Sequence, residues 1–589
     1  MVKSKIKRNQ KPVPLPRFHG YWQALILFGL GFFLYSNTFK HDYVLDDSGA
    51  ITLNGFVQQG FKGIPDLLKV EFWHFNNISL GYYRPLSLIT FAIEHQYFGN
   101  DPHASHINNG IIYGLTGSFL FLMLSRTFAN LHWMFAFFIT ALFVVHPVHT
   151  EVVANLKSRD ELLSFLNLVL ILFFALKYVD TQKRSHLFFA LLFFYFALLS
   201  KETAVTGLAL LPLFLYFFRF DNLKKSMMKT LPFVVIAFLF FIQKYQMIGT
   251  LSGNPPTDII NYPYAITHTK LPSTFLIFYK CVRVVVVPYP LIYDYSYNQI
   301  PPGSFSDFYT IAGLALMIGL IVLSALLIKK NKIISFSLIF FFITLMPAML
   351  FVFSRGGIFA ERFLYAPCLA FCVLLSYFIF HLFRVDLPVT APSIIKNRKA
   401  LNIKPVILVG AITILFALMT RTRNPAWANN ISLFSTDIKN AKNSAQNHRH
   451  YGSQLIDQSF ATKDASFKQI YFKEGVTELK TALAIHPGFG EAYFKLGYAY
   501  QSCIPNNDSA IYYYKKAIKA SPGYVISYSN LGILYQWMGK MEMASYYYNK
   551  AIQVNPNYPD AYALRDTIKK YYHLDVKILP DSVMKKIMD

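Results

Sequence analysis

The polar residues of this 589-residue chain that could perform chemistry stand in short motifs at the ends of apolar runs. HPVHTE places His146, His149 and Glu151 directly after the run MFAFFITALFVV. Imidazole and carboxylate groups transfer protons, and they are also common metal ligands. A second motif, LDDS, carries the adjacent carboxylates Asp46 and Asp47. Either of these two could act as the general base for a hydroxyl nucleophile.

Positive charges occupy comparable positions in three further motifs, YYRPL, SKET and SRGGIFAER. Arginine forks match phosphate oxygens, and a lysine supplies a compact positive charge. Two carboxylates and several cations beside a bilayer suggest that a lipid-linked phosphate is the leaving group and a hydroxyl is the acceptor. The candidates for phosphate binding are Arg84, Lys201, Arg355 and Arg362.

Each motif also has a plain structural explanation. An Asp-Asp pair often caps a helix or turn, and an arginine near a span often anchors headgroups. The Lys201-Glu202 and Glu361-Arg362 pairs could be local salt bridges. A metal site is a weak alternative for HPVHTE, because no strong ligand beyond His146, His149 and Glu151 is near in sequence. We therefore expect no required cofactor, with a divalent metal as the minor option.

The composition is typical of a membrane protein, with 54% hydrophobic, 17% aromatic and 15% charged residues. Apolar stretches long enough to cross about 30 Å of hydrocarbon fill roughly the first 420 residues. We expect eleven spans, near 21–38, 107–125, 132–147, 161–179, 186–200, 203–219, 230–246, 309–328, 333–353, 362–383 and 404–420.

Short basic runs such as QKR and KKNK lie between the apolar stretches and account for much of the net charge of +25. The positive-inside rule makes them cytoplasmic anchors, which is a better explanation than a nucleic-acid surface. With a cytoplasmic N-terminus, all five polar motifs then face the opposite compartment, where they could form one site. A twelfth apolar stretch carries Lys280 and Arg283 in its middle, so we expect it to be re-entrant or interfacial.

The sequence of the C-terminal part repeats, and each repeat is long enough to form one pair of helices. YFKLGYAY and YSNLGILY share their spacing, and Pro487, Pro522 and Pro556 are 35 and 34 residues apart. This pattern predicts a tetratricopeptide-repeat solenoid over 448–589, after a linker at 421–447. An odd number of spans would place the repeats on the non-cytoplasmic side. They could bind peptide on a concave surface or act as a docking spacer.

Five segments in this order, followed by the repeats, resemble the transmembrane and tetratricopeptide repeat-containing (TMTC) protein family: LDDSGAITLN, YYRPLSLITF, HPVHTEVVANLKSRDELL, LLSKETAVTGLALL and FAERFLYAPCLAFC. The resemblance covers nearly the whole chain. It implies an all-α, multispanning type C (GT-C) glycosyltransferase domain over 1–420, with its first outer loop at 39–106. Such enzymes move a sugar from a polyprenyl-phosphate donor to an acceptor on the non-cytoplasmic side, and the eukaryotic relatives are protein O-mannosyltransferases using dolichyl-phosphate mannose.

The resemblance also implies roles for residues. Asp46 or Asp47, with a slight preference for the first, would deprotonate an acceptor Ser or Thr. Direct attack would invert the anomeric carbon, and the four candidate cations would stabilise the departing phosphate. Supporting residues would line the acceptor or sugar side or orient the cations: Tyr83, His146, His149, Glu151, Glu202 and Glu361.

The expected partners are a polyprenyl-phosphate-linked sugar (mannose or another hexose), an acceptor protein or peptide, and membrane lipid. A composition rich in Lys, Ile, Tyr and Asn favours a bacterial inner membrane with site and repeats in the periplasm, or the endoplasmic reticulum lumen in a eukaryote. Two alternatives stay open: a transferase for a glycan or lipid acceptor, and a non-catalytic scaffold. A transporter would hold its ionisable residues at mid-membrane rather than at one end.

Overall fold

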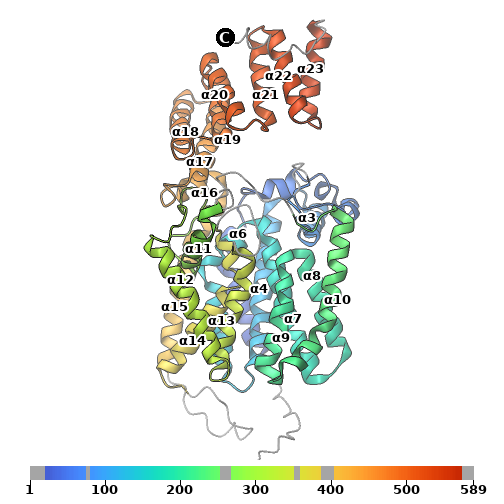
Figure 1. The fold of residues 1–589 in the computed structure, drawn as a ribbon, viewed down its shortest axis with the longest axis vertical. Coiled ribbons are helices and arrows are strands. Elements are labelled where there is room, and N and C mark those ends of the chain that lie inside the picture. Colours follow the sequence, from blue (N-terminus) through green and yellow to red (C-terminus); the bar gives the residue numbers. More distant parts are fainter. Residues whose placement is uncertain (1–19, 75–79, 253–266, 350–358, 386–402, 573–589) are drawn as a thin grey trace, which may run out of the picture. The chain divides into compact units, whose positions relative to one another are not determined.

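The computed structural model describes residues 20–74, 80–252, 267–349, 359–385 and 403–572, and every regular element in these ranges is helical (Figure 1). The expected all-α class is therefore confirmed. The chain divides into two compact units. Unit 1 comprises Met1–Tyr293 and Pro302–Leu433, and unit 2 comprises Asp294–Pro301 and Phe434–Asp589.

A helix coincides with each of the eleven apolar stretches of unit 1. In the described ranges, six helical segments are long and apolar enough to cross a membrane, and a bent pair raises the number to seven. The chain is thus an integral membrane protein by helix length and composition, while the count of eleven spans stays a prediction. The eleven helices are α1 (Tyr21–Leu34), α4 (Pro102–Thr127), α5 (Trp133–Val145), α7 (Arg159–Thr181), α8 (Arg184–Ser200), α9 (Gly207–Leu215), α10 (Leu223–Ile248), α12 (Phe308–Leu327), α13 (Lys332–Leu345), α14 (Cys368–Leu382) and α15 (Ile403–Arg423).

The bent pair is formed by HPVHTE. Helix α5 ends at Val145, a short 3-10 turn covers Pro147–His149, and α6 (Thr150–Ala154) then leaves at an angle of 51°. A proline disfavours helical backbone in the residue before it, and His146 is accordingly extended, with φ −65° and ψ 125°. The motif therefore turns the chain back into the protein, where His146, His149 and Glu151 are all buried.

The first outer loop folds into a small helical layer that contains α2 (Ile64–Leu67) and α3 (Pro85–Phe98). Leu88 and Phe91 of α3 pack with Val57, Phe72 and Leu156 in one buried apolar cluster. This layer holds both the Asp46-Asp47 pair and Arg84 against the start of α7. The stretch with Lys280 and Arg283 forms α11 (Lys270–Val286), which packs against α12; its depth in the membrane stays a prediction.

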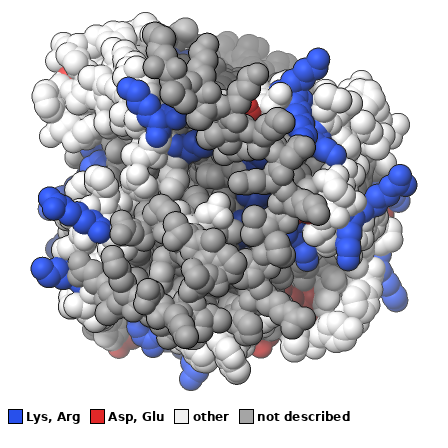
Figure 2. Space-filling view, turned by 90° about the horizontal axis from the view of Figure 1, so that it is seen from below, with Lys and Arg blue, Asp and Glu red and all other residues white. Residues whose placement is uncertain are grey.

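Ion pairs join the helix ends at the opposite side of unit 1. Asp180, at the end of α7, pairs with Arg126 of α4 at 2.9 Å and with Arg219 at 2.9 Å. Asp221, before α10, pairs with Lys332 at the start of α13. These pairs place the helix ends next to QKR and KKNK at one end of unit 1. Figure 2 shows lysine and arginine side chains spread around this end, with acidic ones sparse among them.

Unit 2 is a row of paired helices. The pairs are α17 (Ala445–Ala461) with α18 (Ala465–Ile485), α19 (Gly490–Tyr498) with α20 (Asn507–Ala520), and α21 (Val525–Trp537) with α22 (Met541–Val554); α23 (Pro559–Tyr572) packs against α22. The motifs YFKLGYAY and YSNLGILY begin in α19 and α21, the first helices of the last two pairs. The short segment Asp294–Pro301 joins this unit, since the Asp294 carbonyl accepts a hydrogen bond from the Asn447 side chain at 3.1 Å.

The repeated Leu-Gly motif permits close helix packing. A Cβ added to Gly497 would lie 2.6 Å from the Tyr514 ring, and one added to Gly532 would lie 2.5 Å from the Tyr548 ring. Both tyrosines are fully buried. Because the two contacts recur at the repeat spacing, glycine is required at these positions for one helix of a pair to approach the next.

Candidate functional site

The two adjacent aspartates differ completely in environment. Asp47 is fully buried, and its two carboxylate oxygens accept hydrogen bonds from the backbone N–H groups of Val44 at 3.0 Å and Lys157 at 2.6 Å. Burial raises the pKa of Asp47 to about 7, against the effect of those hydrogen bonds. Asp46 is exposed, and its carboxylate makes no direct hydrogen bond to the described residues. Asp47 therefore braces the loop, and Asp46 is the accessible carboxylate.

Backbone geometry produces this division. Leu45 has a positive φ of 53°, a left-handed conformation that costs a residue other than glycine about 1–3 kcal/mol. Its N–H donates to the Asn430 side chain at 2.9 Å, which helps to hold the turn. The turn sends the two neighbouring aspartates in different directions, so one is buried while the other stays in solvent.

Arg84 lies between two carboxylates. Its Nη1 donates to Asp160 at 2.7 Å and its Nε donates to Glu202 at 3.0 Å. The side chain is 6% exposed, and its guanidinium also covers the ring of Tyr82 at 4.4 Å. Tyr83 is buried beside it and donates its backbone N–H to Glu202 at 2.6 Å. In this arrangement Arg84 and Glu202 connect α3, α7 and the turn before α9.

Arg362 has one strong partner and keeps a free side. Oε2 of Glu151 accepts the backbone N–H of Arg362 at 2.9 Å, and Oε1 accepts its guanidinium. Glu151 is 1% exposed, whereas the Arg362 side chain is 31% exposed. Burial acts to lower the pKa of Arg362, but Glu151 and the charge of Asp46 raise it above its ordinary value. The neighbouring Glu361 is buried, with Oε1 accepting the N–H of Ile292 at 2.7 Å.

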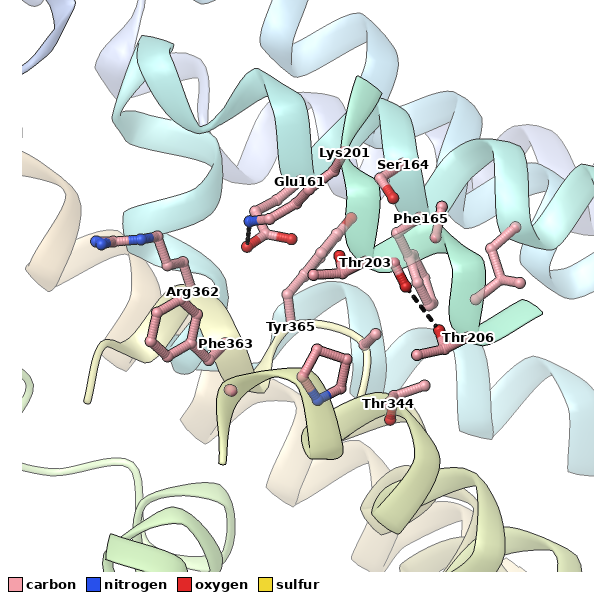
Figure 3. Close-up of a pocket in the computed structure, with 15 residues that line it drawn as sticks. Glu161, Ser164, Phe165, Lys201, Thr203, Thr206, Thr344, Arg362, Phe363 and Tyr365 are labelled. Atoms are coloured by element: carbon pink, nitrogen blue, oxygen red, sulfur yellow. Dashed lines mark hydrogen bonds and ion pairs between the residues drawn. The ribbon is translucent and has the colours of Figure 1, made fainter. Parts of the chain in front are cut away.

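Lys201 and Arg362 line the same pocket, which has a volume of about 580 Å³ including the part open to solvent. Lys201 pairs with Glu161, and Figure 3 shows these two side chains pointing toward each other while Arg362 extends to the edge of the pocket. Burial lowers the pKa of Lys201 to about 8, although Glu161 and Asp160 oppose this effect. Hydroxyl and apolar groups complete the lining: Ser164, Phe165, Leu168, Thr203, Thr206, Thr344, Phe363 and Tyr365.

The histidines of HPVHTE face the protein interior. His146 Nε2 lies 2.9 Å from the Val285 carbonyl oxygen, and its Nδ1 accepts the Val148 N–H. Nδ1 of His149 lies 2.9 Å from the hydroxyl of Tyr113. With Glu151 committed to Arg362, these side chains have separate protein partners. Within the described ranges no group of three or more His, Cys, Asp or Glu residues could hold a metal ion.

The structure thus brings Asp46, Lys201, Glu151 and Arg362 to one end of unit 1, on or beside a single pocket. Arg84, Glu202, Glu361 and Tyr83 brace the surrounding turns, and Arg355 lies outside the described residues. Sequence reasoning missed Glu161 and Asp160, which partner Lys201 and Arg84. The signal was present, because RDELL places two carboxylates at the start of an apolar helix, where ionisable groups usually have a function.

The fold and site define a polytopic membrane protein that carries a helical-repeat unit. The tetratricopeptide repeat family model matches residues 525–558, which include α21 and α22. Among curated proteins, Mus musculus protein O-mannosyl-transferase TMTC4 is 27% identical over 506 residues, covering 77% of this chain. Homo sapiens protein O-mannosyl-transferase TMTC4 is 26% identical over 497 residues, covering 75% of this chain. The resemblance to the TMTC family is therefore confirmed by homologues over about three quarters of the chain.

The chain spans about two thirds of the length of these relatives, since the matches cover 66% of the mouse protein and 65% of the human one. Among solved structures, a crystal structure of MamA covers 28% of this chain and 94% of that chain. Its sequence identity is 23% and its TM-score is 0.20, so this similarity supports no conclusion about function.

Proposed function

We propose that this chain is an inverting O-glycosyltransferase that moves mannose or another hexose from a polyprenyl-phosphate donor to Ser or Thr hydroxyls of proteins. One observation carries the proposal: a pocket between membrane helices holds Lys201 and Arg362, with an exposed carboxylate, Asp46, whose charge acts on Arg362. The names of the homologous O-mannosyl-transferases support the choice of reaction and of a protein acceptor.

Asp46 is the proposed general base. It takes the proton of the acceptor hydroxyl as the hydroxyl oxygen attacks the anomeric carbon. The new bond joins that oxygen to the sugar, and the bond between the sugar and the donor phosphate breaks. Because attack and departure occur on opposite faces, the anomeric configuration inverts. The step uses only side chains of this chain, so it requires no cofactor.

Lys201 and Arg362 are the proposed phosphate ligands. The lipid phosphate leaves as an anion, and preorganised positive groups in a site shielded from water stabilise such a charge most strongly in the transition state. Each cation already has a carboxylate partner, Glu161 or Glu151, which holds its side chain in place before the donor binds. A phosphate oxygen would share Lys201 with Glu161 and use the exposed side of Arg362. Arg84 would act through Asp160 and Glu202 rather than touch the phosphate.

The proposed orientation places the pocket on the non-cytoplasmic side. The basic helix ends joined by Asp180 and Asp221 would face the cytoplasm under the positive-inside rule. The site would then open to the periplasm in a bacterium or to the endoplasmic reticulum lumen in a eukaryote. The repeats of unit 2 would lie in the same compartment and would offer a surface for the acceptor protein.

The test is a transfer assay with the full chain in proteoliposomes, using a panel of polyprenyl-phosphate sugars and a Ser/Thr peptide. Label should move to the peptide from at least one donor. Lys201→Ala and Arg362→Ala should each lower kcat/KM for the donor, whereas Lys62→Ala, at an exposed lysine in the first outer loop, should leave it unchanged. Transfer to a glycan or lipid but not to peptide would contradict the proposed acceptor. No transfer from any donor would favour a scaffold.

A further inference from the structure

A second cavity lies inside the helix bundle of unit 1, and no step of the proposed chemistry uses it. Its volume is about 430 Å³, including the part that is open to the surroundings, and its walls are almost entirely apolar. Thr127 and Ser337 contribute the only hydroxyl side chains, and both of these donate within their own helices, to the Met123 and Ile333 carbonyls. The cavity therefore suits a hydrocarbon chain and offers nothing to a sugar or phosphate.

The two cavities follow one another along the same helices. On α7, Leu168 lines the polar pocket and Leu172 lines the apolar cavity. On α13 the corresponding residues are Thr344 and Phe340. Each pair is one helical turn apart, which is about 6 Å along the helix axis. The turn Glu202–Thr206 before α9 and Ala366 before α14 line the polar pocket, whereas α9 and α14 themselves line the apolar cavity. The apolar cavity therefore lies next to the polar pocket on its cytoplasmic side.

The apolar cavity extends along the helices for more than one turn. Its lining on α13 runs from Phe340 to Ile333, a distance of about 10 Å at 1.5 Å per residue. Phe214, Phe336, Leu369 and Ala370 form its buried wall. Such a wall gains free energy from apolar contact in proportion to the area that a ligand covers.

We propose that this cavity binds the first isoprene units of the lipid donor and selects donors by their hydrocarbon chain. The inference rests on the proposed function, because that function places a lipid phosphate at Lys201 and Arg362. A phosphate bound there begins a hydrocarbon chain at the level of Leu168 and Thr344. The chain can then enter the bundle between α7, α9, α13 and α14 instead of leaving directly into the bilayer.

The experiment fills the cavity and varies the donor. Ala370 is 1% exposed on α14, and Ala370→Phe adds a ring inside the cavity. Val373→Phe provides a second filling variant if the first does not fold. Ala325→Phe adds the same ring on an exposed face of α12 and is the matched control. Donor KM is measured with an undecaprenyl-phosphate sugar and with an ethyl-phosphate sugar, whose chain is too short to enter the cavity.

The filling variants should raise the KM of the long-chain donor by about tenfold, which corresponds to losing a few buried methylene groups. They should change the KM of the short-chain donor much less, and Ala325→Phe should change neither. Equal effects on both donors, or no effect from a folded filling variant, would overturn the proposal.

Native mass spectrometry with undecaprenyl phosphate separates this inference from the proposed reaction. Binding that is retained by wild type and by Ala325→Phe but lost in Ala370→Phe supports the cavity even if no sugar is transferred. A phospholipid that copurifies with the protein, and that undecaprenyl phosphate does not displace, would show that the cavity holds a structural membrane lipid and would overturn the inference.

Discussion

The Glu151 carboxylate holds Arg362 at two points, the backbone N–H at 2.9 Å and the guanidinium, across 211 positions of sequence. The acid is buried and the arginine is partly exposed at the edge of the pocket. This pairing fixes the direction of the guanidinium before a donor arrives. We therefore propose that Glu151 is a positioning residue, through which HPVHTE acts on Arg362.

Glu151→Gln keeps the shape of the side chain but removes its charge. The amide can accept only with its single oxygen, so one of the two links to Arg362 is lost. A small displacement of a charge-stabilising group can lower transfer by up to about 100-fold. Thermal stability should change little, because the Arg362 side chain is 31% exposed and can reach water.

The measurement is kcat/KM for the donor together with a melting curve in detergent. Glu151→Asp keeps the charge and should retain more activity than Glu151→Gln. Full activity in Glu151→Gln would contradict the positioning role.

Asp46→Asn should lower kcat by about 10² to 10⁴-fold, the usual contribution of a general base. Glu161→Gln tests whether Glu161, the acid that lines the pocket, is the general base instead. Asp47→Asn is the comparison for an aspartate whose role is structural. An asparagine at 47 can accept only one of the two backbone N–H groups, so it should cost about 1–3 kcal/mol of stability while leaving kcat per folded molecule nearly unchanged.

Single-turnover transfer and thermal melting of the three variants separate these roles. If Glu161→Gln abolishes transfer while Asp46→Asn does not, the base is Glu161. Equal activity in Asp46→Asn and wild type would exclude Asp46.

The pH dependence of donor use should report on Lys201. Its pKa is lowered to about 8, mainly by burial, from about 10.4 in an unfolded chain. The ammonium is charged below that value and loses its proton as pH rises through about 8, so kcat/KM for the donor should fall there. The arginine of Lys201→Arg stays charged at alkaline pH. In this variant the fall of kcat/KM above about pH 8 should disappear, even if its activity is lower at neutral pH. If kcat/KM of Lys201→Arg still falls in the same pH range, a group other than Lys201 causes the fall.

The repeats can be tested at one glycine. Gly532→Ala places a methyl group against the buried Tyr548 ring and should destabilise unit 2 by about 1–3 kcal/mol. Gly523→Ala is the matched control, because nothing lies within 4 Å of its added Cβ. If the repeats present the acceptor, Gly532→Ala should reduce transfer to a folded protein but not to a short peptide. Hydrogen exchange of the full chain confirms that the loss of protection is confined to the repeats.

Periodic features could be predicted from the sequence. Apolar runs, basic loops and the glycine and proline spacing identified the eleven apolar helices of unit 1 and two helix pairs of unit 2. The predicted repeat range, 448–589, covers most of the first helix of the first pair, α17. No motif marks that helix, because its sequence, AQNHRHYGSQLIDQSFA, lacks the Leu-Gly signature and is largely polar.

The roles of individual charges could not be predicted. Asp46 and Asp47 are identical in type, but the left-handed turn at Leu45 and the contact with the Lys157 N–H leave Asp47 buried and Asp46 exposed. Arg84 and Arg362 look equally suited to phosphate in sequence, but Arg84 is paired on two sides by acids that lie 76 and 118 residues away. Such contacts depend on tertiary packing, which no local pattern encodes.

The central claim is direct displacement of a lipid phosphate by an acceptor hydroxyl. The most direct measurement is the anomeric configuration of the product, read by NMR from the glycopeptide formed with a single donor of known configuration. The account predicts that wild type yields a glycopeptide of the opposite anomeric configuration to the donor. A product that retains the donor's configuration would contradict direct displacement.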